Sequence, residues 1–293
     1  MKRLLLMGVW LVLALAASTN HAFAAANLNA GVLTVTGIAG DDEIQLQVGP
    51  TAGQVVVIKA PGVADGTIFN GVHQILVANG PGASDKVEIK AELTSDLAIT
   101  IETDRGDDSI KLETKALGGT VNARVDVIGI SGKNTVEWLV DSAAQNLGLT
   151  FTNNSITGID DMILKVEADN PSARLAVNLV ANTGISDDNI EAVIKSAAAV
   201  VDLDIAADAG NGYDKFKLEL DQLTAAQITA DFAIDMSALD DHVEIALKGS
   251  SSIAVVNGRI SGNTNNDSLV LFVEGAASGA PVSYTHLTLP TKA

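Results

Sequence analysis

The chain has 293 residues, a formal net charge of −18 and no cysteine. Nucleic acids and anionic lipids bind basic patches, so this acidic chain is predicted to bind neither of them and to attract cations instead. The lack of cysteine excludes a fold held together by disulfides, and a hydrophobic content of 47% excludes the composition of a disordered protein.

The first 24 residues have the features of a secretory signal peptide. Lys2 and Arg3 precede an apolar run over residues 4–17, and Ala22-Phe23-Ala24 provides a small-x-small cleavage site. The run is too short to cross a membrane, and no later stretch is long and apolar enough. We therefore expect an exported bacterial protein without a transmembrane segment in its mature part, located outside the cell, on its surface or in the periplasm.

Residues 25–95 show a recurring phrase at irregular spacing. An aspartate stands two positions before an apolar residue in Asp42-x-Ile44 and again in Asp85-x-Val87. The interval between the two aspartates is longer than the spacing that follows. This part is predicted to form less regular N-terminal coils or a cap.

From residue 96 onward the same phrase recurs at intervals of 26 or 27 residues. The aligned copies are Asp108-x-Ile110, Asn134-x-Val136, Asp161-x-Ile163, Asp188-x-Ile190, Asp214-x-Phe216, Asp241-x-Val243 and Asp267-x-Leu269. Such a period indicates a repeat architecture in which each unit buries its apolar residues against the next. The apolar residue of each copy is predicted to lie in one stacked interior column.

A second stretch of alternating apolar and polar residues lies between successive copies. These strand candidates are residues 98–103, 122–129, 147–152, 173–180, 200–206 and 230–236. Two strands and two turns per unit predict an all-β fold, a parallel β-helix or β-solenoid with coils of about 26 residues, as one domain over residues 25–281. A β-sandwich, which also has many short strands, is the alternative.

The last twelve residues, VSYTHLTLPTKA (282–293), lack the repeat. They resemble the translation of a sequencing adapter, and we treat them as a non-native tail outside the fold. We expect the natural chain to continue differently beyond residue 281.

Acidic residues gather in the turns that precede the repeated phrase. Stacked coils would place them about 5 Å apart, and many copies carry a doublet such as Asp107-Asp108. Carboxylates this close must share protons, be separated by solvent or share a cation, and Ca²⁺ prefers such oxygen ligands. Alternatively, the side chains only form tight turns, which Asn134 in the same column favours.

One turn, GNGYDKF (210–216), resembles the calcium-binding repeats of the repeats-in-toxin family, with Gly-x-Gly-x-Asp-x-apolar spacing. GDDEI (40–44) and GDDSI (106–110) match the last five positions. The resemblance covers the turns and not the whole coil. It implies calcium held by Asp42, Asp108 and Asp214 with the turns at Gly40, Gly106, Gly210 and Gly212. With the neighbouring acids, the candidate calcium ligands are Asp41, Asp42, Asp104, Asp107, Asp108, Asp160, Asp161, Asp187, Asp188, Gly210, Gly212, Asp214, Asp240 and Asp241.

Two functional classes are open. The first is a non-catalytic repeat protein of the cell surface or extracellular matrix, adhesin-like and calcium-stabilised, with cell-surface glycans or proteins as partners. The second is a carbohydrate-active β-helix enzyme, a lyase or hydrolase, for which Arg105, Arg124, Arg174 and Arg259 would be candidates. No hydrolase elbow, phosphate-binding loop or His-Glu-x-x-His motif occurs, and the short, uniform return segments favour the first class.

Overall fold

The computed structural model describes residues 25–80, 84–129, 131–155, 160–224, 226–262, 266–276 and 282–288. The predicted signal peptide lies outside these residues. In the described part the regular elements are strands, and it contains no helix that could span a bilayer.

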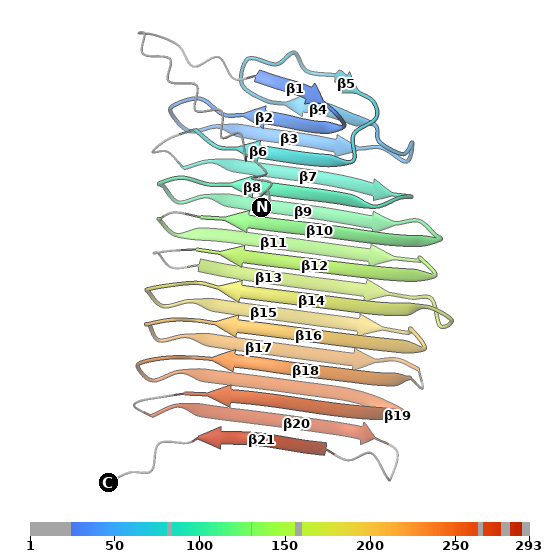
Figure 1. Ribbon diagram of the computed structural model, residues 1–293, viewed down its shortest axis with the longest axis vertical. Helices are drawn as coiled ribbons and strands as arrows, with labels where there is room; N and C mark the ends of the chain where they lie inside the picture. The colour runs from blue at the N-terminus through green and yellow to red at the C-terminus, as the bar shows by residue number, and fades with distance from the viewer. Residues whose placement is uncertain are drawn as a thin grey trace, which may run out of the picture.

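The chain forms a parallel β-solenoid of about 7 coils of about 26 residues (Figure 1). Each coil contributes one strand to each of two facing sheets. Sheet A contains β2 (Val32–Thr36), β6 (Gln74–Ala78), β8 (Leu97–Glu102), β10 (Thr120–Ile128), β12 (Asn146–Asn154), β14 (Arg174–Asn182), β16 (Val200–Asp208), β18 (Gln227–Asp235), the second part of β19 (His242–Ser261) and β21 (Val282–Thr288). Sheet B contains β3 (Glu43–Val48), β7 (Lys86–Leu93), β9 (Ser109–Ala116), β11 (Asn134–Ser142), β13 (Asp160–Ala168), β15 (Asn189–Ser196), β17 (Lys215–Gln222), the first part of β19 and β20 (Ser268–Ala276).

The pairing between coils is parallel, which confirms the predicted solenoid over the β-sandwich. Ile110 pairs with Val136, and Ile190 pairs with Phe216 one coil further on. Because equivalent residues stack directly on one another, a side chain and its repeats form a column along the long axis of the molecule.

The register prediction at β13 is wrong by one residue. Asn134 pairs with Asp160 and Val136 with Met162, so Met162 and not Ile163 occupies the interior column. A shift of one residue exchanges the two faces of a strand. Placing Ile163 inside would have turned Lys165 into the core, whereas the observed register buries Leu164 and leaves Lys165 exposed.

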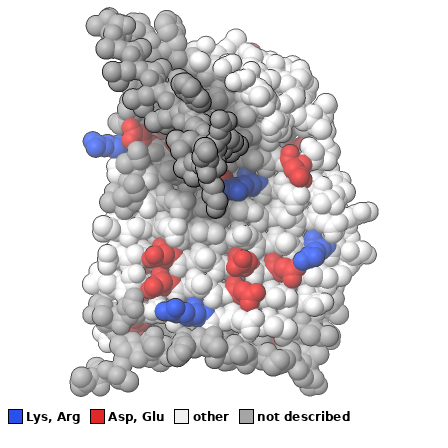
Figure 2. All heavy atoms as spheres, in the orientation of Figure 1, with Lys and Arg blue, Asp and Glu red and all other residues white. Residues whose placement is uncertain are grey.

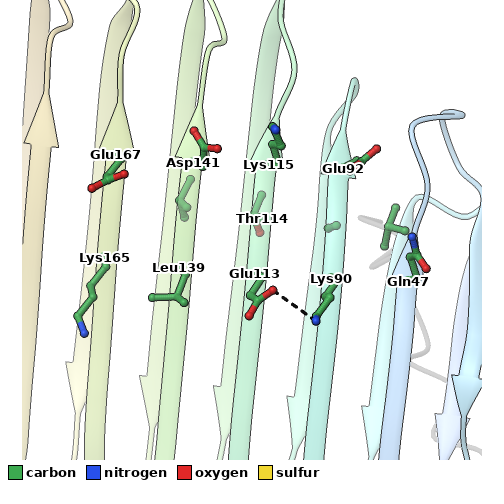
Figure 3. A pocket seen from close by; sticks show the side chains of 13 residues that line it. Gln47, Lys90, Glu92, Glu113, Thr114, Lys115, Leu139, Asp141, Lys165 and Glu167 are labelled. Carbon is green, nitrogen blue, oxygen red and sulfur yellow. Dashed lines mark ion pairs between the residues drawn. The ribbon is translucent and has the colours of Figure 1, made fainter.

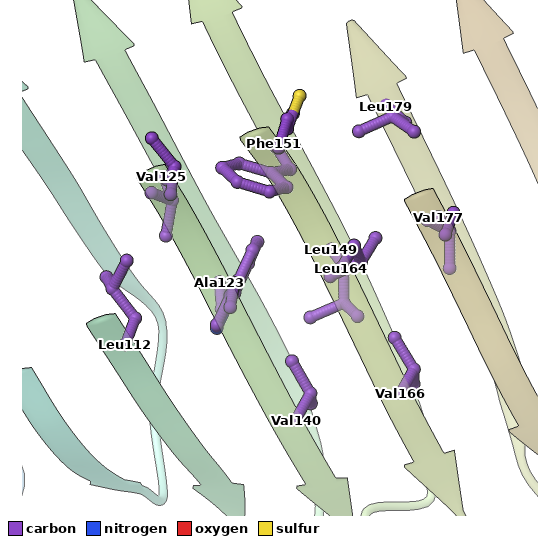
Figure 4. Close-up of a cluster of buried hydrophobic side chains, with 14 of the residues drawn as sticks. Leu112, Ala123, Val125, Val140, Leu149, Phe151, Leu164, Val166, Val177 and Leu179 are labelled. Atoms are coloured by element: carbon purple, nitrogen blue, oxygen red, sulfur yellow. The ribbon is translucent and has the colours of Figure 1, made fainter. Parts of the chain in front are cut away.

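The inward side chains of successive coils fill the space between the two sheets. Figure 4 shows part of this core. Its largest members, Trp138 and Phe151, meet edge to face with ring centroids 5.4 Å apart. The Trp138 indole N–H donates to the Thr114 hydroxyl at 2.9 Å, which satisfies a buried donor. Each fully buried large apolar side chain contributes about 1.5–3 kcal/mol, so the stacked columns are the main source of stability.

Antiparallel strands cover the N-terminal end of the solenoid. β1 (Ala25–Asn29) pairs with β2, while β4 (Val55–Lys59) and β5 (Thr67–Phe69) form an antiparallel extension of β3. β4 and β5 account for the long interval between Asp42 and Asp85 (Figure 1).

The C-terminal tail takes part in the fold, contrary to the sequence prediction. Residues 282–288 form β21, which pairs with β19 at the edge of sheet A, with a register shift between Gly258 and Ile260. The alternating sequence VSYTHLT has strand propensity and lies beside an open sheet edge, where backbone pairing is available. The remaining residues, 289–293, lie outside the described part.

Candidate functional site

The repeated aspartate forms a hydrogen-bonded column, here called the inner ladder. Its described members are Asp42, Asp85, Asp108, Asn134, Asp188, Asp214, Asp241 and Asp267. The Oδ1 atom of a member accepts the backbone N–H of the equivalent residue one coil earlier. These N···O distances are 2.8 Å for Asp42 to Asp85, 2.9 Å for Asp85 to Asp108, 3.3 Å for Asp108 to Asn134, 2.9 Å for Asp188 to Asp214, 2.9 Å for Asp214 to Asp241 and 3.1 Å for Asp241 to Asp267.

The inner ladder closes the hydrogen bonding of each coil where sheet B begins. The residue after a ladder member donates its N–H to the backbone carbonyl of the previous member, as Lys215 does to Asp188 at 2.9 Å. The backbone N–H of the ladder residue itself lies just before the first of these strand hydrogen bonds. Its acceptor is the side chain of the equivalent residue in the next coil. An amide oxygen serves as well as a carboxylate, which explains Asn134.

The acids immediately before the ladder act in the opposite direction. In this outer ladder the carboxylate accepts an N–H from the following coil. The N···O distances are 3.2 Å from Ser84 to Asp41, 2.8 Å from Lys133 to Asp107, 2.9 Å from Tyr213 to Asp187 and 2.9 Å from Asn266 to Asp240. In an Asp-Asp doublet, the second carboxylate therefore accepts an N–H from the preceding coil, and the first accepts an N–H from the following coil.

Burial raises the pKa of several carboxyl groups in the inner ladder. Asp214 is 1% exposed, and this desolvation, opposed by the hydrogen bond from Asp188 and reinforced by Asp241 and Asp187, raises its pKa to about 7. Desolvation also raises the pKa of Asp85 and of Asp241 to about 6. These groups exchange protons near neutral pH.

The residue five positions before a ladder member differs from coil to coil. Desolvation raises the pKa of Asp108, while a hydrogen bond with the Thr103 hydroxyl, five residues earlier, acts to lower it. The corresponding residue is Ala209 for Asp214 and Met236 for Asp241, and neither carries a donor. The Oδ2 atoms of Asp108, Asp214 and Asp241 are all buried without a hydrogen-bond partner among the described residues, so burial of this oxygen is common to the three.

The two glycines of the GNGYD turn are required by the close approach of coils. Gly210 has φ +77°, and a Cβ on it would lie 1.7 Å from the carbonyl oxygen of Gly184. A Cβ on Gly212 would lie 1.8 Å from the Ser186 oxygen. Backbone contact between coils therefore explains both glycines without any bound ion.

The remaining predicted ligands do not converge on one point. Asp104 is half-buried, and its backbone carbonyl accepts the Ser131 N–H at 3.3 Å. Asp160 stands in the ladder register, while Asp161 lies on the outer face of β13, 3.8 Å from the Lys133 amine. No group of three or more His, Cys, Asp or Glu side chains in the described residues is placed to hold a metal ion. Calcium binding remains a prediction.

The outer face of sheet B carries an ion-pair network that the sequence analysis missed. The Lys90 amine lies 3.1 Å from Glu88. It also lies 3.7 Å from Glu113, and both of these residues line a shallow depression of about 550 Å³ (Figure 3). Similar pairs recur along the sheet, such as Lys217–Glu191 at 3.4 Å and Lys248–Glu219 at 2.8 Å. The available signal was charge alternation at one repeat position, since Glu88, Lys111 and Glu137 occupy one column.

The arginines considered for an enzyme lie mainly on sheet A. Arg124 pairs with Asp126 at 2.7 Å and Arg174 with Asp202 at 2.8 Å, both at exposed positions.

In comparisons with family models, curated proteins and solved structures, nothing matches this chain. The hydrogen bonds of the inner and outer ladders join successive coils, so both ladders have a structural role.

Proposed function

We propose that the protein is an exported, non-catalytic rod of the cell surface or extracellular matrix that acts as an adhesin. The observation that carries this proposal is the uniformity of the corners. Between β7 and β20 successive strands are joined by only three to six residues. A carbohydrate-active enzyme requires long loops that build a cleft around convergent acids. Connections of this length are too short to form such loops.

Both faces of the rod are regular arrays suited to contact with an extended partner. Equivalent side chains repeat about every 5 Å along the axis, so a long ligand meets the same kind of group at each step. Cell-surface glycans and matrix proteins are such ligands.

The decisive experiment measures adhesion and turnover on the same substrates. The full chain would be tested for processing after Ala24, for retention on immobilised polysaccharides and matrix proteins, and for release of reducing or unsaturated sugar ends. We expect processing and retention without turnover. Substrate cleavage would contradict the non-catalytic role, and retention on none of the surfaces would contradict adhesion.

We further propose that calcium stabilises the turns. Its support is the crowding of carboxylates, since Asp104 and Asp107 both act to raise the pKa of Asp108, together with the repeats-in-toxin-like turn at 210–216. The carboxylates of the inner ladder are buried whereas the outer acids Asp41, Asp107, Asp187 and Asp240 are exposed, so the ion would bind the outer acids.

Thermal unfolding after chelation tests this part. Calcium should raise Tm more than magnesium or sodium at matched ionic strength, because an ion bound only to the folded state stabilises it by mass action. Identical curves in the three salts would show that the acids act through hydrogen bonds alone.

A further inference from the structure

The outer face of sheet A contains a shallow trough of about 580 Å³. It crosses the strands from β10 to β18, with Gly148 and Ala176 side by side at its centre. These small residues stand in the column where neighbouring coils carry Asn122 and Asp202. The trough therefore follows the solenoid axis, on the face that Figure 2 turns toward the viewer and on which few side chains are charged.

Two carboxylates in this trough are neighbours without a compensating base. β16 and β18 pair Asp204 directly with Asp231. Like charges side by side on a sheet destabilise the fold, so their presence needs an explanation. Among the described side chains neither is in an ion pair, and Asp231 accepts only the Asn257 amide, at 2.8 Å.

The nearby arginines do not neutralise this pair. Arg174 is engaged by Asp202 at 2.8 Å, and Arg124 by Asp126 at 2.7 Å. The described lysines, by contrast, lie on the outer face of sheet B or in the turns that lead into it, where several of them pair with glutamates. The negative charge of the trough is therefore available to a ligand.

Neutral polar groups accompany the carboxylates. Thr150, Asn178 and Thr229 line the trough, and within the described residues their side chains make no hydrogen bond to the protein. Thr150 and Asn178 stand in the same column as Asp204 and Asp231, one coil apart. No lining residue is aromatic, so recognition here depends on charge and hydrogen bonds and not on ring stacking.

We propose that this trough binds a linear glycan carrying free amino groups, laid along the solenoid axis. Its ammonium groups would lie against Asp204 and Asp231 and relieve their repulsion, while its hydroxyls would bond to Thr150, Asn178 and Thr229. An anionic polymer is repelled by these acids, and a neutral one leaves the paired carboxylates uncompensated. The inference rests on the proposed adhesive function and names its ligand class.

The test is titration of the full chain, in mildly acidic buffer, with a glucosamine oligomer and with the N-acetylated oligomer of equal length. We expect the amine form to bind at least about tenfold more tightly, and added salt to weaken it. The double variant Asp204→Asn/Asp231→Asn should lose at least about tenfold in affinity. Ala176→Gln should also weaken binding, by filling the trough without changing its charge. Asp221→Asn on sheet B is the matched control and should have no effect.

Three results would overturn the inference: equal binding of both oligomers, unchanged affinity in the double variant, or equally tight binding of oligolysine, which lacks hydroxyls. Adhesion of the wild-type chain to a surface, without binding of the glucosamine oligomer, would overturn the trough proposal and leave the proposed function standing. Oligomer binding without adhesion to any surface would contradict the adhesive function alone.

Discussion

At the scale of the residue, the repeated aspartate is explained by one acceptor atom. Asp214 receives the Asp188 N–H on Oδ1, and its Oδ2 is buried without a hydrogen-bond partner among the described residues. The hydrogen bond fixes the alignment of two coils, while the second oxygen makes the ionised form costly. The same side chain therefore stabilises the fold through its geometry and destabilises it through its charge.

Substitution at Asp214 should separate these two effects. Asp214→Asn keeps the acceptor and removes the charge, so its free energy of unfolding near neutral pH should equal or exceed that of the wild type. Asp214→Ala leaves the buried Asp188 N–H without its acceptor and should cost about 1–3 kcal/mol. Urea unfolding of both variants measures the difference. Equal losses in the two variants would contradict the role of the acceptor.

The pH dependence of stability follows from the direction of the pKa shifts. Asp85, Asp214 and Asp241 have folded-state pKa values of about 6, 7 and 6, above the ordinary value of 3.8. The folded state thus holds protons that the unfolded state releases, so their contribution is complete below the ordinary value and is lost as pH rises through about 6–7. The free energy of unfolding should fall from about pH 5 to about pH 8 by on the order of 1–3 kcal/mol.

Other groups limit the effect at lower pH. The paired glutamates Glu43, Glu113 and Glu219 have pKa values held below 4.5 by neighbouring lysines, and their contribution is lost as pH falls through those values. Chemical unfolding across the pH range checks the prediction. Asp214→Asn should flatten the neutral part of the profile, and a wild-type profile that rises from pH 5 to 8 would contradict it.

At the scale of the element, the register of β13 is set by the whole strand and not by one residue. Met162, Leu164 and Val166 face inward, while Ile163 stands between Glu137 and Glu191 on the outer face. Met162→Lys should therefore cost at least about 4 kcal/mol or prevent folding, since it buries an unpaired charge.

The matched variant at the next position should be tolerated. Ile163→Lys places a cation between two glutamates, and its free energy of unfolding should remain within about 1 kcal/mol of the wild type. Thermal melts of the two variants decide the register. A more severe loss in Ile163→Lys than in Met162→Lys would reverse it.

The corner glycines provide a second test at this scale. Gly210 and Gly119 have similar φ values, +77° and +70°, but only Gly210 lies against backbone of the preceding coil. Gly119→Ala should cost about 1–2 kcal/mol from the left-handed conformation alone. Gly210→Ala should cost several kcal/mol in urea unfolding, because coil stacking must also shift. Equal costs would mean that close packing is not what requires Gly210.

At the scale of the whole molecule, the period of the phrase was enough to predict the parallel solenoid and the placement of two strands per coil. Asp108, Asp188 and Asp214 could be assigned to one column because their spacing equals the coil length. The role of that column could not be deduced from the sequence. Whether these side chains accept backbone hydrogen bonds or bind a cation depends on the distances between atoms of successive coils. The error at Ile163 arose because the Asp160-Asp161 doublet fits the phrase in two registers. The connection after β13 is longer than those after β11 and β15, so the period alone favoured Asp161 although Asp160 is the residue that pairs with Asn134.

Surface features were less accessible from the sequence. The ion pairs of sheet B and the Asp204–Asp231 pair of sheet A join residues a coil apart, and their contact depends on register. Column-by-column alignment of outward positions would have found the alternation of Glu88, Lys111 and Glu137. It would also have placed Gly148 and Ala176 in the column of Asn122 and Asp202, but not the shape of the trough, which depends on how neighbouring side chains lie, as Asn122 does beside Gly148.

The most direct measurement of the ladder is hydrogen exchange at a single amide. The Asp214 N–H donates to Asp241 Oδ1 at 2.9 Å. In Asp241→Ala this amide should exchange at least about tenfold faster than in the wild type, while neighbouring strand amides such as that of Lys215 retain their protection. Asp241→Asn should preserve protection at Asp214. Unchanged exchange of the Asp214 amide in Asp241→Ala would contradict the claim that the repeated aspartate holds successive coils together.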